Sequence, residues 1–190
     1  SRAPAPIVSV VGGRGGAGAS LLTVALALAG ARAGRTTALL DTDPLGCGAD
    51  LYLGCDDTGR DTGWGDLVNR QGRMRWHDLR PGLPGTTGVS VLTWARRSGT
   101  APPAPLPVGA VRTALSSARH GNELVVVDLP RSFDPATRVL LNRSDLVLVV
   151  VPADVHSVVA ATRMVERLRT ESPVARLVVR GAVGELSADV

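Results

Sequence analysis

The 190-residue sequence contains no lysine, because all 21 of its basic residues are arginine. Without a lysine amine the chain cannot form a Schiff base, and it lacks the ammonium group with which an ordinary P-loop holds phosphate. Aromatic residues are also scarce, with one Tyr, one Phe and three Trp. We therefore do not expect a platform of aromatic side chains on which single-stranded bases would stack.

Cysteines and long apolar runs are equally sparse. Cys47 and Cys55 have no partner at metal-ligand spacing, and nothing resembles a signal peptide, so we expect a reduced, cytoplasmic protein. The most apolar helix-like run, residues 21–33, is shorter than the ~20 residues of a membrane span. Any membrane contact is therefore expected to be indirect, through a partner or through a segment outside this sequence.

What is present is a globular composition, with 44% hydrophobic and 20% charged residues, which predicts a single domain over residues 1–190. Short Val- and Leu-rich runs predict strands at residues 7–11, 37–41, 89–93, 124–128, 146–151 and 177–179. Helical patterns lie between them at residues 20–32, 64–69, 108–119, 135–142 and 155–169. This alternation predicts an α/β fold with a doubly wound, mostly parallel sheet.

Two stretches interrupt the alternation. Residues 56–84 are polar and glycine-rich, and residues 101–107 contain four prolines, which predicts a stiff internal loop rather than a domain boundary. The chain has no initiator Met and ends soon after the last predicted strand. We therefore expect it to be an excerpt of a longer protein, truncated at its C-terminus.

A glycine-rich loop carries the most informative chemistry. It lies between a predicted strand and a predicted helix in the segment IVSVVGGRGGAGAS, residues 7–20. Gly13, Gly18 and Ser20 occupy the positions of the two glycines and the hydroxyl of a P-loop, with Ala19 in place of the lysine. Glycines let backbone N–H groups curl around an anion, the helix N-terminus adds positive potential, and Ser20 could ligate Mg²⁺. The alternative is a glycine-rich turn that only joins a strand to a helix.

Acidic residues follow two other predicted strands. Asp41 and Asp43 end one strand, and Asp128 ends another. Ligands of an open parallel sheet bind beyond the carboxyl ends of its strands, where the three loops are expected to meet. A carboxylate there can hold Mg²⁺ or orient water. Each Asp taken alone would be explained as a turn or cap residue, but together with the glycine loop they favour a site.

In three segments the chain resembles the MinD/ParA superfamily of deviant-Walker ATPases: residues 14–20 (RGGAGAS), 41–44 (DTDP) and 125–130 (VVVDLP). It is most similar to the actinobacterial CpaE-like branch, which includes septum-site-determining proteins and relatives beside Tad-type pilus and secretion genes. The resemblance implies a P-loop NTPase fold of the SIMIBI/MinD-like class, ATP and Mg²⁺ as cofactors, and a homodimer. It also implies a cytoplasmic regulator that recruits protein partners and localises septum, pilus or secretion machinery, at a cell pole, the septum or the inner face of the membrane.

The resemblance assigns roles residue by residue. Ser20, Asp43 and Asp128 would hold the metal, and Asp43 would also orient the attacking water. The nucleotide-binding segment would consist of Gly13, Arg14, Gly15, Gly16, Ala17, Gly18, Ala19, Ser20 and Leu21, with Asp128. Two positions depart from the family, since Arg14 replaces its signature lysine and Ala19 its P-loop lysine. Loss of a charged donor weakens binding by ~1.5–3 kcal/mol, and loss of a preorganised transition-state donor costs ~3–4 kcal/mol in rate. We therefore expect at most a weak ATPase.

Alternatives remain open at this point. The chain could be a slow Mg-ATPase switch, a nucleotide-free scaffold, or a non-specific DNA binder acting through an arginine-rich surface, which is possible but not favoured. That surface would comprise Arg163, Arg167, Arg169, Arg176 and Arg180. Arg131 could compensate for the lost lysine. We expect none of His77, His120 and His156 to bind metal, and we expect Cys47 to be a small packing residue. Burial and partner contact are equally open for Trp64, Trp76 and Trp94.

Overall fold

The structure is a computed structural model that describes residues 3–57, 59–60, 62–69, 74–94, 105–172 and 174–181. Of the proline-rich stretch expected at 101–107, residues 101–104 lie outside this description. Seven strands form one sheet in the order β3-β4-β2-β5-β1-β6-β7. They are β1 (Ile7–Gly12), β2 (Thr37–Asp41), β3 (Gly85–Thr86), β4 (Val89–Leu92), β5 (Leu124–Asp128), β6 (Leu146–Pro152) and β7 (Ala175–Arg180). Only the β3–β4 pairing is antiparallel among these described strands, which confirms the predicted α/β fold with a mostly parallel sheet.

Helices connect the strands. They are α1 (Ala19–Arg32), α2 (Ala49–Tyr52), α3 (Trp64–Asn69), α4 (Trp76–Leu79), α5 (Val108–Gly121), α6 (Pro135–Arg143) and α7 (Val155–Glu171), with a 3₁₀ turn at Arg80–Gly82. Every strand and helix predicted from the sequence is present. The elements that were not predicted, α2, α4, the 3₁₀ turn and β3, are two to four residues long, and so short a segment shows no readable periodicity.

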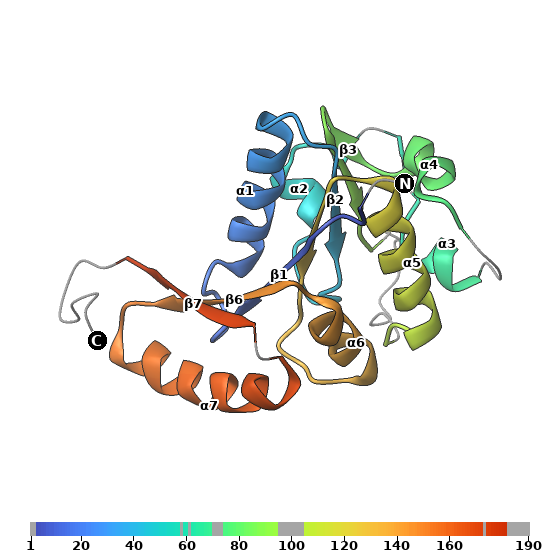
Figure 1. Ribbon diagram of the computed structural model, residues 1–190. Helices are drawn as coiled ribbons and strands as arrows, with labels where there is room; N and C mark the ends of the chain where they lie inside the picture. The colour runs from blue at the N-terminus through green and yellow to red at the C-terminus, as the bar shows by residue number, and fades with distance from the viewer. Residues whose placement is uncertain are drawn as a thin grey trace.

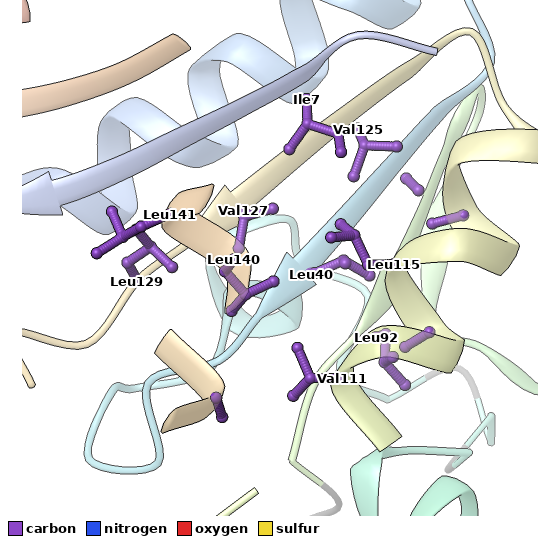
Figure 2. Packing of buried hydrophobic residues seen from close by; sticks show 14 of the residues in the cluster. Ile7, Leu40, Leu92, Val111, Leu115, Val125, Val127, Leu129, Leu140 and Leu141 are labelled. Carbon is purple, nitrogen blue, oxygen red and sulfur yellow. The ribbon is translucent and has the colours of Figure 1, made fainter. Parts of the chain in front are cut away.

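The helices cover both faces of the sheet (Figure 1). On one face, Val24 and Ala27 of α1 pack with Leu39, Val91 and other buried residues of the strands. The opposite face carries a larger cluster, in which strand side chains meet those of α5 and α6 (Figure 2). The residues labelled there are Ile7, Leu40, Leu92, Val111, Leu115, Val125, Val127, Leu129, Leu140 and Leu141. Strands buried on both faces explain why the strand segments are almost continuously apolar.

Two helices begin at aspartate caps, as helix-entry residues in the sequence indicate. The Asp134 carboxylate accepts a hydrogen bond from the Thr137 amide at the start of α6, at 2.9 Å. The Asp154 carboxylate accepts one from the Ser157 amide at the start of α7, also at 2.9 Å. Each cap satisfies an amide that has no partner within its helix. The cap of α7 also faces the glycine loop, because Asp154 contacts Arg14.

The parallel register brings the carboxyl ends of the strands to one edge of the sheet. Asp41 of β2 pairs with Asp128 of β5, and Asp128 also pairs with Val10 of β1. The Thr42 hydroxyl and amide both donate to the Asp128 carbonyl, at 2.6 and 3.0 Å. The loop after β1 and the acidic ends of β2 and β5 therefore lie next to one another.

Candidate nucleotide site

The glycine loop turns sharply between β1 and α1. Gly16 and Gly18 have φ angles of 72° and 93°, a left-handed conformation that L side chains rarely adopt. Helix α1 begins at Ala19, and Gly18 at its N-cap has no side chain to accept from the first amides of the helix. These amides face the loop together with the positive end of the helix dipole, an arrangement that binds anions.

Asp128 lies at the base of the loop and is 4% exposed. The Thr23 hydroxyl donates to its carboxylate at 3.4 Å, and the Ser20 hydroxyl also hydrogen-bonds to it. Burial raises the pKa of Asp128 to about 7, although the Ser20 hydrogen bond lowers it, and the nearby Asp41 and Asp43 raise it further. The charged carboxylate is therefore poorly stabilised by the protein alone, and a cation beside it would favour ionisation.

The two aspartates after β2 have different surroundings. Asp41 is buried, and its carboxylate accepts from the Ala49 amide at 2.9 Å and from the Thr93 hydroxyl at 2.8 Å. Burial raises the pKa of Asp41 to about 6, opposed by these hydrogen bonds. Asp43 instead borders the open cavity beside the glycine loop. Asp41 is thus a structural residue that holds the loop after β2, and Asp43 is the carboxylate available to a ligand.

The glycine loop and these carboxylates border one cavity of about 310 Å³. Its walls come from the glycine loop, the loop after β2, the loop after β5 and the end of β7. The lining residues are Gly12, Arg14, Gly15, Gly16, Ala17, Gly18, Ala19, Ser20, Leu21, Asp43, Leu45, Gly46, Cys47, Tyr52, Asp128, Leu129, Arg131 and Arg180. An anion cradle and two carboxylates therefore face the same space.

Three arginines reach this cavity, and they differ in their partners. Arg14 is turned toward the start of α7, where its Nε donates to the Ser157 hydroxyl and its Nη2 lies 3.4 Å from the Asp154 carboxylate. Arg131 lies beside Gly15, since a Cβ at Gly15 would be 3.6 Å from Arg131 Nη2. Arg180 donates from Nη1 to the carbonyl oxygen of Ala17, at 3.3 Å.

Comparison with known proteins identifies the fold, although no protein-family model matches the chain. The ParA family ATPase of Chlorobium tepidum superposes with a TM-score of 0.81 at 16% identity, covering 94% of this chain and 75% of that one. The MinD cell division protein of Aquifex aeolicus superposes with a TM-score of 0.68 at 20% identity, covering 92% and 69%. The chain has the ParA/MinD ATPase fold. A MinC:MinD complex of Aquifex aeolicus matches as well, with a TM-score of 0.73 at 19% identity, covering 92% of this chain and 68% of that one.

Closer sequence relatives of this ParA/MinD-fold chain come from Mycobacterium tuberculosis. The uncharacterized proteins MT3760 and Rv3660c, from strains CDC 1551 and H37Rv, are each 43% identical to it over 175 residues. This alignment covers 92% of the present chain and 47% of each relative. The chain therefore spans about half the length of the curated relatives that it matches.

Most residues that the sequence singled out border the cavity of this ParA/MinD fold: residues 14–21, Asp43 and Asp128. Gly13 does not line it. A Cβ at Gly13 would lie 3.1 Å from Cβ of Ala161, and the Gly13 amide donates to the Val150 carbonyl at 2.9 Å. Close packing against β6 and α7 thus explains this glycine.

Sequence reasoning did not assign several residues of the cavity wall to the site, among them Tyr52 and Arg180. Tyr52 lies in the short helix α2, which no sequence pattern predicted. Arg180 was grouped with a possible basic surface, although its position immediately after a predicted strand indicated the same sheet edge. That surface is divided in the structure, because Arg167 stacks on the Phe133 ring at 4.5 Å and Arg180 turns to the glycine loop. The separation gives no support to the DNA-binding alternative.

The remaining candidate residues are the three tryptophans and Cys47. Trp64 and Trp76 are buried, and the Trp64 indole donates to the Asp41 carbonyl at 2.6 Å, whereas Trp94 is half-buried against the core. Cys47 is exposed at the cavity wall, so it is not the packing residue that we expected.

No cluster of three or more His, Cys, Asp or Glu side chains is placed to bind a metal in the described part of the chain. None of its described helices is long and apolar enough to span a membrane.

Proposed function

We propose that this chain is the nucleotide-binding domain of a MinD/ParA-like positioning protein of the CpaE-like, septum-site-determining type. It binds ATP with Mg²⁺ and acts by recruiting partners, with slow hydrolysis at most. One observation carries the proposal: the N-terminus of α1, the glycine loop and the carboxylates Asp43 and Asp128 all border a single cavity.

The residues present fit a magnesium-bound nucleotide. A Cβ at Gly16 would meet no atom within 4 Å and would extend into open space beside the loop, so glycine leaves this space to a ligand. Mg²⁺ typically takes one or two protein carboxylates together with phosphate oxygens, and Asp128, Asp43 and the Ser20 hydroxyl supply such a set. Ser20, Asp43 and Asp128 would hold the metal, the glycine loop would bind phosphate, and Asp43 would also orient a water molecule.

Two substitutions relative to the family argue for regulation rather than fast turnover. Ala19 places a methyl group where an ammonium group would stabilise the developing charge, and losing such a donor costs ~3–4 kcal/mol in rate. Arg14 is engaged with Ser157 and Asp154 of its own chain. Both features favour binding with little hydrolysis.

Partners are proposed by similarity. One structural neighbour is a MinC:MinD complex, which supports a protein-binding role for this fold. We propose that this chain forms a homodimer, binds proteins of septum or Tad-type pilus and secretion assemblies in the cytoplasm, and reaches the membrane only indirectly. A nucleotide-free scaffold is the contrasting alternative.

Two glycines at opposite ends of α1 provide a matched test. Gly16 and Gly34 have φ angles of 72° and 76°, and a Cβ at either position would meet no atom within 4 Å. Ala at each site should therefore cost similar stability, about 1–2 kcal/mol from backbone strain. Of these two glycines, only Gly16 borders the cavity. Calorimetry with ATP and Mg²⁺ should show micromolar to low-millimolar binding that Gly16→Ala weakens and Gly34→Ala preserves.

The possible outcomes separate the alternatives. No heat of binding for the unsubstituted chain would identify a nucleotide-free scaffold and reject the proposal. Equal weakening by both substitutions would place the nucleotide elsewhere or indicate a general loss of structure. Steady-state phosphate release that disappears with Asp43→Ala would show that the protein is a slow Mg-ATPase.

A further inference from the structure

Arg180 lies against the glycine loop from the last described strand. Its Nη1 donates to the Ala17 carbonyl at 3.3 Å. A Cβ at Gly18 would be 2.5 Å from Arg180 Nη1, 3.4 Å from Cζ and 3.6 Å from Cδ. The guanidinium and the end of its aliphatic stem therefore lie along the loop at the start of α1, where only a glycine leaves room for them.

The backbone of Arg180 is held by two neighbouring segments. Its Cα pairs with Pro152 at the end of β6, and the Ala153 amide donates to the Arg180 carbonyl at 2.9 Å. Arg180 thus extends from the carboxyl end of a parallel strand, the edge of the sheet where this cavity lies. Strand β7 thus fixes the position of the Arg180 backbone, and the Arg180 side chain extends from there to the cavity.

Most donors of this guanidinium are still available to a ligand. An arginine side chain has five N–H groups. Within the described part of the chain, the Arg180 side chain makes no hydrogen bond or ion pair except the one to the Ala17 carbonyl. Arg14 differs, because Ser157 and Asp154 occupy it. Arg131 borders the same cavity beside Gly15.

A positively charged side chain in this cavity would balance the charge of bound phosphates. A triphosphate brings several negative charges into a site that already contains Asp43 and Asp128. Ala19 contributes no charge where a P-loop lysine would balance them. A guanidinium binds phosphate through paired N–H donors, so an arginine entering from β7 can supply the charge from another direction.

We propose that Arg180 replaces the P-loop lysine, binding the nucleotide phosphates from β7 instead of from α1. This inference rests on the proposed function, because it requires that the cavity bind a nucleotide. It assigns the phosphate-binding cation of this chain to a residue 161 positions after Ala19, outside the glycine loop.

The test compares ligands with and without phosphate. Binding of ATP and of adenosine, each with Mg²⁺, is measured for the unsubstituted chain and for Arg180→Ala. Loss of a charged hydrogen-bond donor should weaken ATP binding ~10- to 150-fold. Adenosine affinity should not change, because adenosine carries no phosphate. Arg180→Lys should bind ATP with an affinity between those of Arg180→Ala and the unsubstituted chain, since it keeps the charge but loses the paired donors.

Arg176→Ala is the matched control. Arg176 is on the same strand and the same side of the sheet, is exposed, and donates to the neighbouring Ala175 carbonyl at 2.9 Å. It does not border the cavity, so this variant should bind ATP normally. Arg180→Gln, which keeps length and polarity without charge, replaces Arg180→Ala if circular dichroism shows that the alanine variant is unfolded.

The binding measurements distinguish failure of the proposed function from failure of the Arg180 assignment. If the unsubstituted chain binds no ATP, the proposed function fails and this inference fails with it. If it binds ATP and Arg180→Ala or Arg180→Gln binds equally well, only the assignment of Arg180 is wrong. If ATP and adenosine affinities fall together, Arg180 only braces the loop through Ala17, and the assignment is again wrong.

Discussion

At the scale of single residues, burial of the Asp128 carboxylate beside the glycine loop lowers the stability of the folded protein. Asp128 is buried under the glycine loop, and that burial raises its pKa to about 7. From the ordinary pKa of 3.8 up to about 7, the unfolded chain has released this proton while the folded chain retains it. Stability therefore falls as pH rises through this interval, because the unfolded state binds fewer protons.

Asp128→Asn should remove this dependence. The amide has a similar shape and stays neutral, so in EDTA at pH 8 the variant should be more stable than the unsubstituted chain by about 2–4 kcal/mol. The difference should shrink toward zero as pH falls to about 4. Urea unfolding at pH 4 to 8 measures it. A variant that is less stable at pH 8 would contradict the burial argument, and Mg²⁺ should stabilise only the unsubstituted chain.

At the scale of elements, the sequence predicted the long helices and core strands but not the short segments packed against them. Helix α4 (Trp76–Leu79) is an example, since its four residues are defined by contact with α5 rather than by periodicity. The side chain of Trp76 is almost completely buried, and its Cβ lies against the last residue of α5, Gly121. A glycine is needed there because any Cβ would overlap with Trp76.

Two glycines of α5 test this packing. Gly121→Ala would place a methyl group onto Cβ and the ring of Trp76, close to the backbone of α4, and should destabilise the protein by about 1–3 kcal/mol. Gly109→Ala near the other end of α5 meets nothing within 4 Å and should be neutral or stabilising by up to about 1 kcal/mol. Thermal unfolding of both variants measures the difference. Equal effects would show that α4 moves away without cost.

At the scale of the whole molecule, apolar side chains border the mouth of the candidate site. Leu45 is 85% exposed and Leu21 is 51% exposed, and both line the cavity. Exposed leucines beside a ligand site favour contact with another protein surface. In the homodimer that we propose, this face of one copy would meet the same face of the second.

Leu45→Ser should therefore weaken a nucleotide-dependent dimer. Removing one buried leucine contact costs about 1.5–3 kcal/mol, so at saturating ATP the dimer dissociation constant should rise at least ~10-fold. Leu177→Ser, at a 58% exposed leucine of β7 that does not border the cavity, is the control. Sedimentation with ATP and Mg²⁺ measures both. An unchanged dimer, or equal weakening by both variants, would move the interface away from this face.

Local patterns along the chain were sufficient to predict the strand and helix order, the sheet class, and the glycine loop with Asp43 and Asp128 beside it. These features follow from short-range physics: the spacing of apolar residues, the backbone freedom of glycine, and the convergence of parallel strand ends at one edge. Packing between distant segments decided the rest. Such packing buries Asp41, whose carboxylate holds the loop after β2, and places Gly13 against α7. It also places Arg180 beside the glycine loop at Gly18. No local pattern encodes these contacts, because each depends on how residues far apart in sequence meet once the sheet has formed.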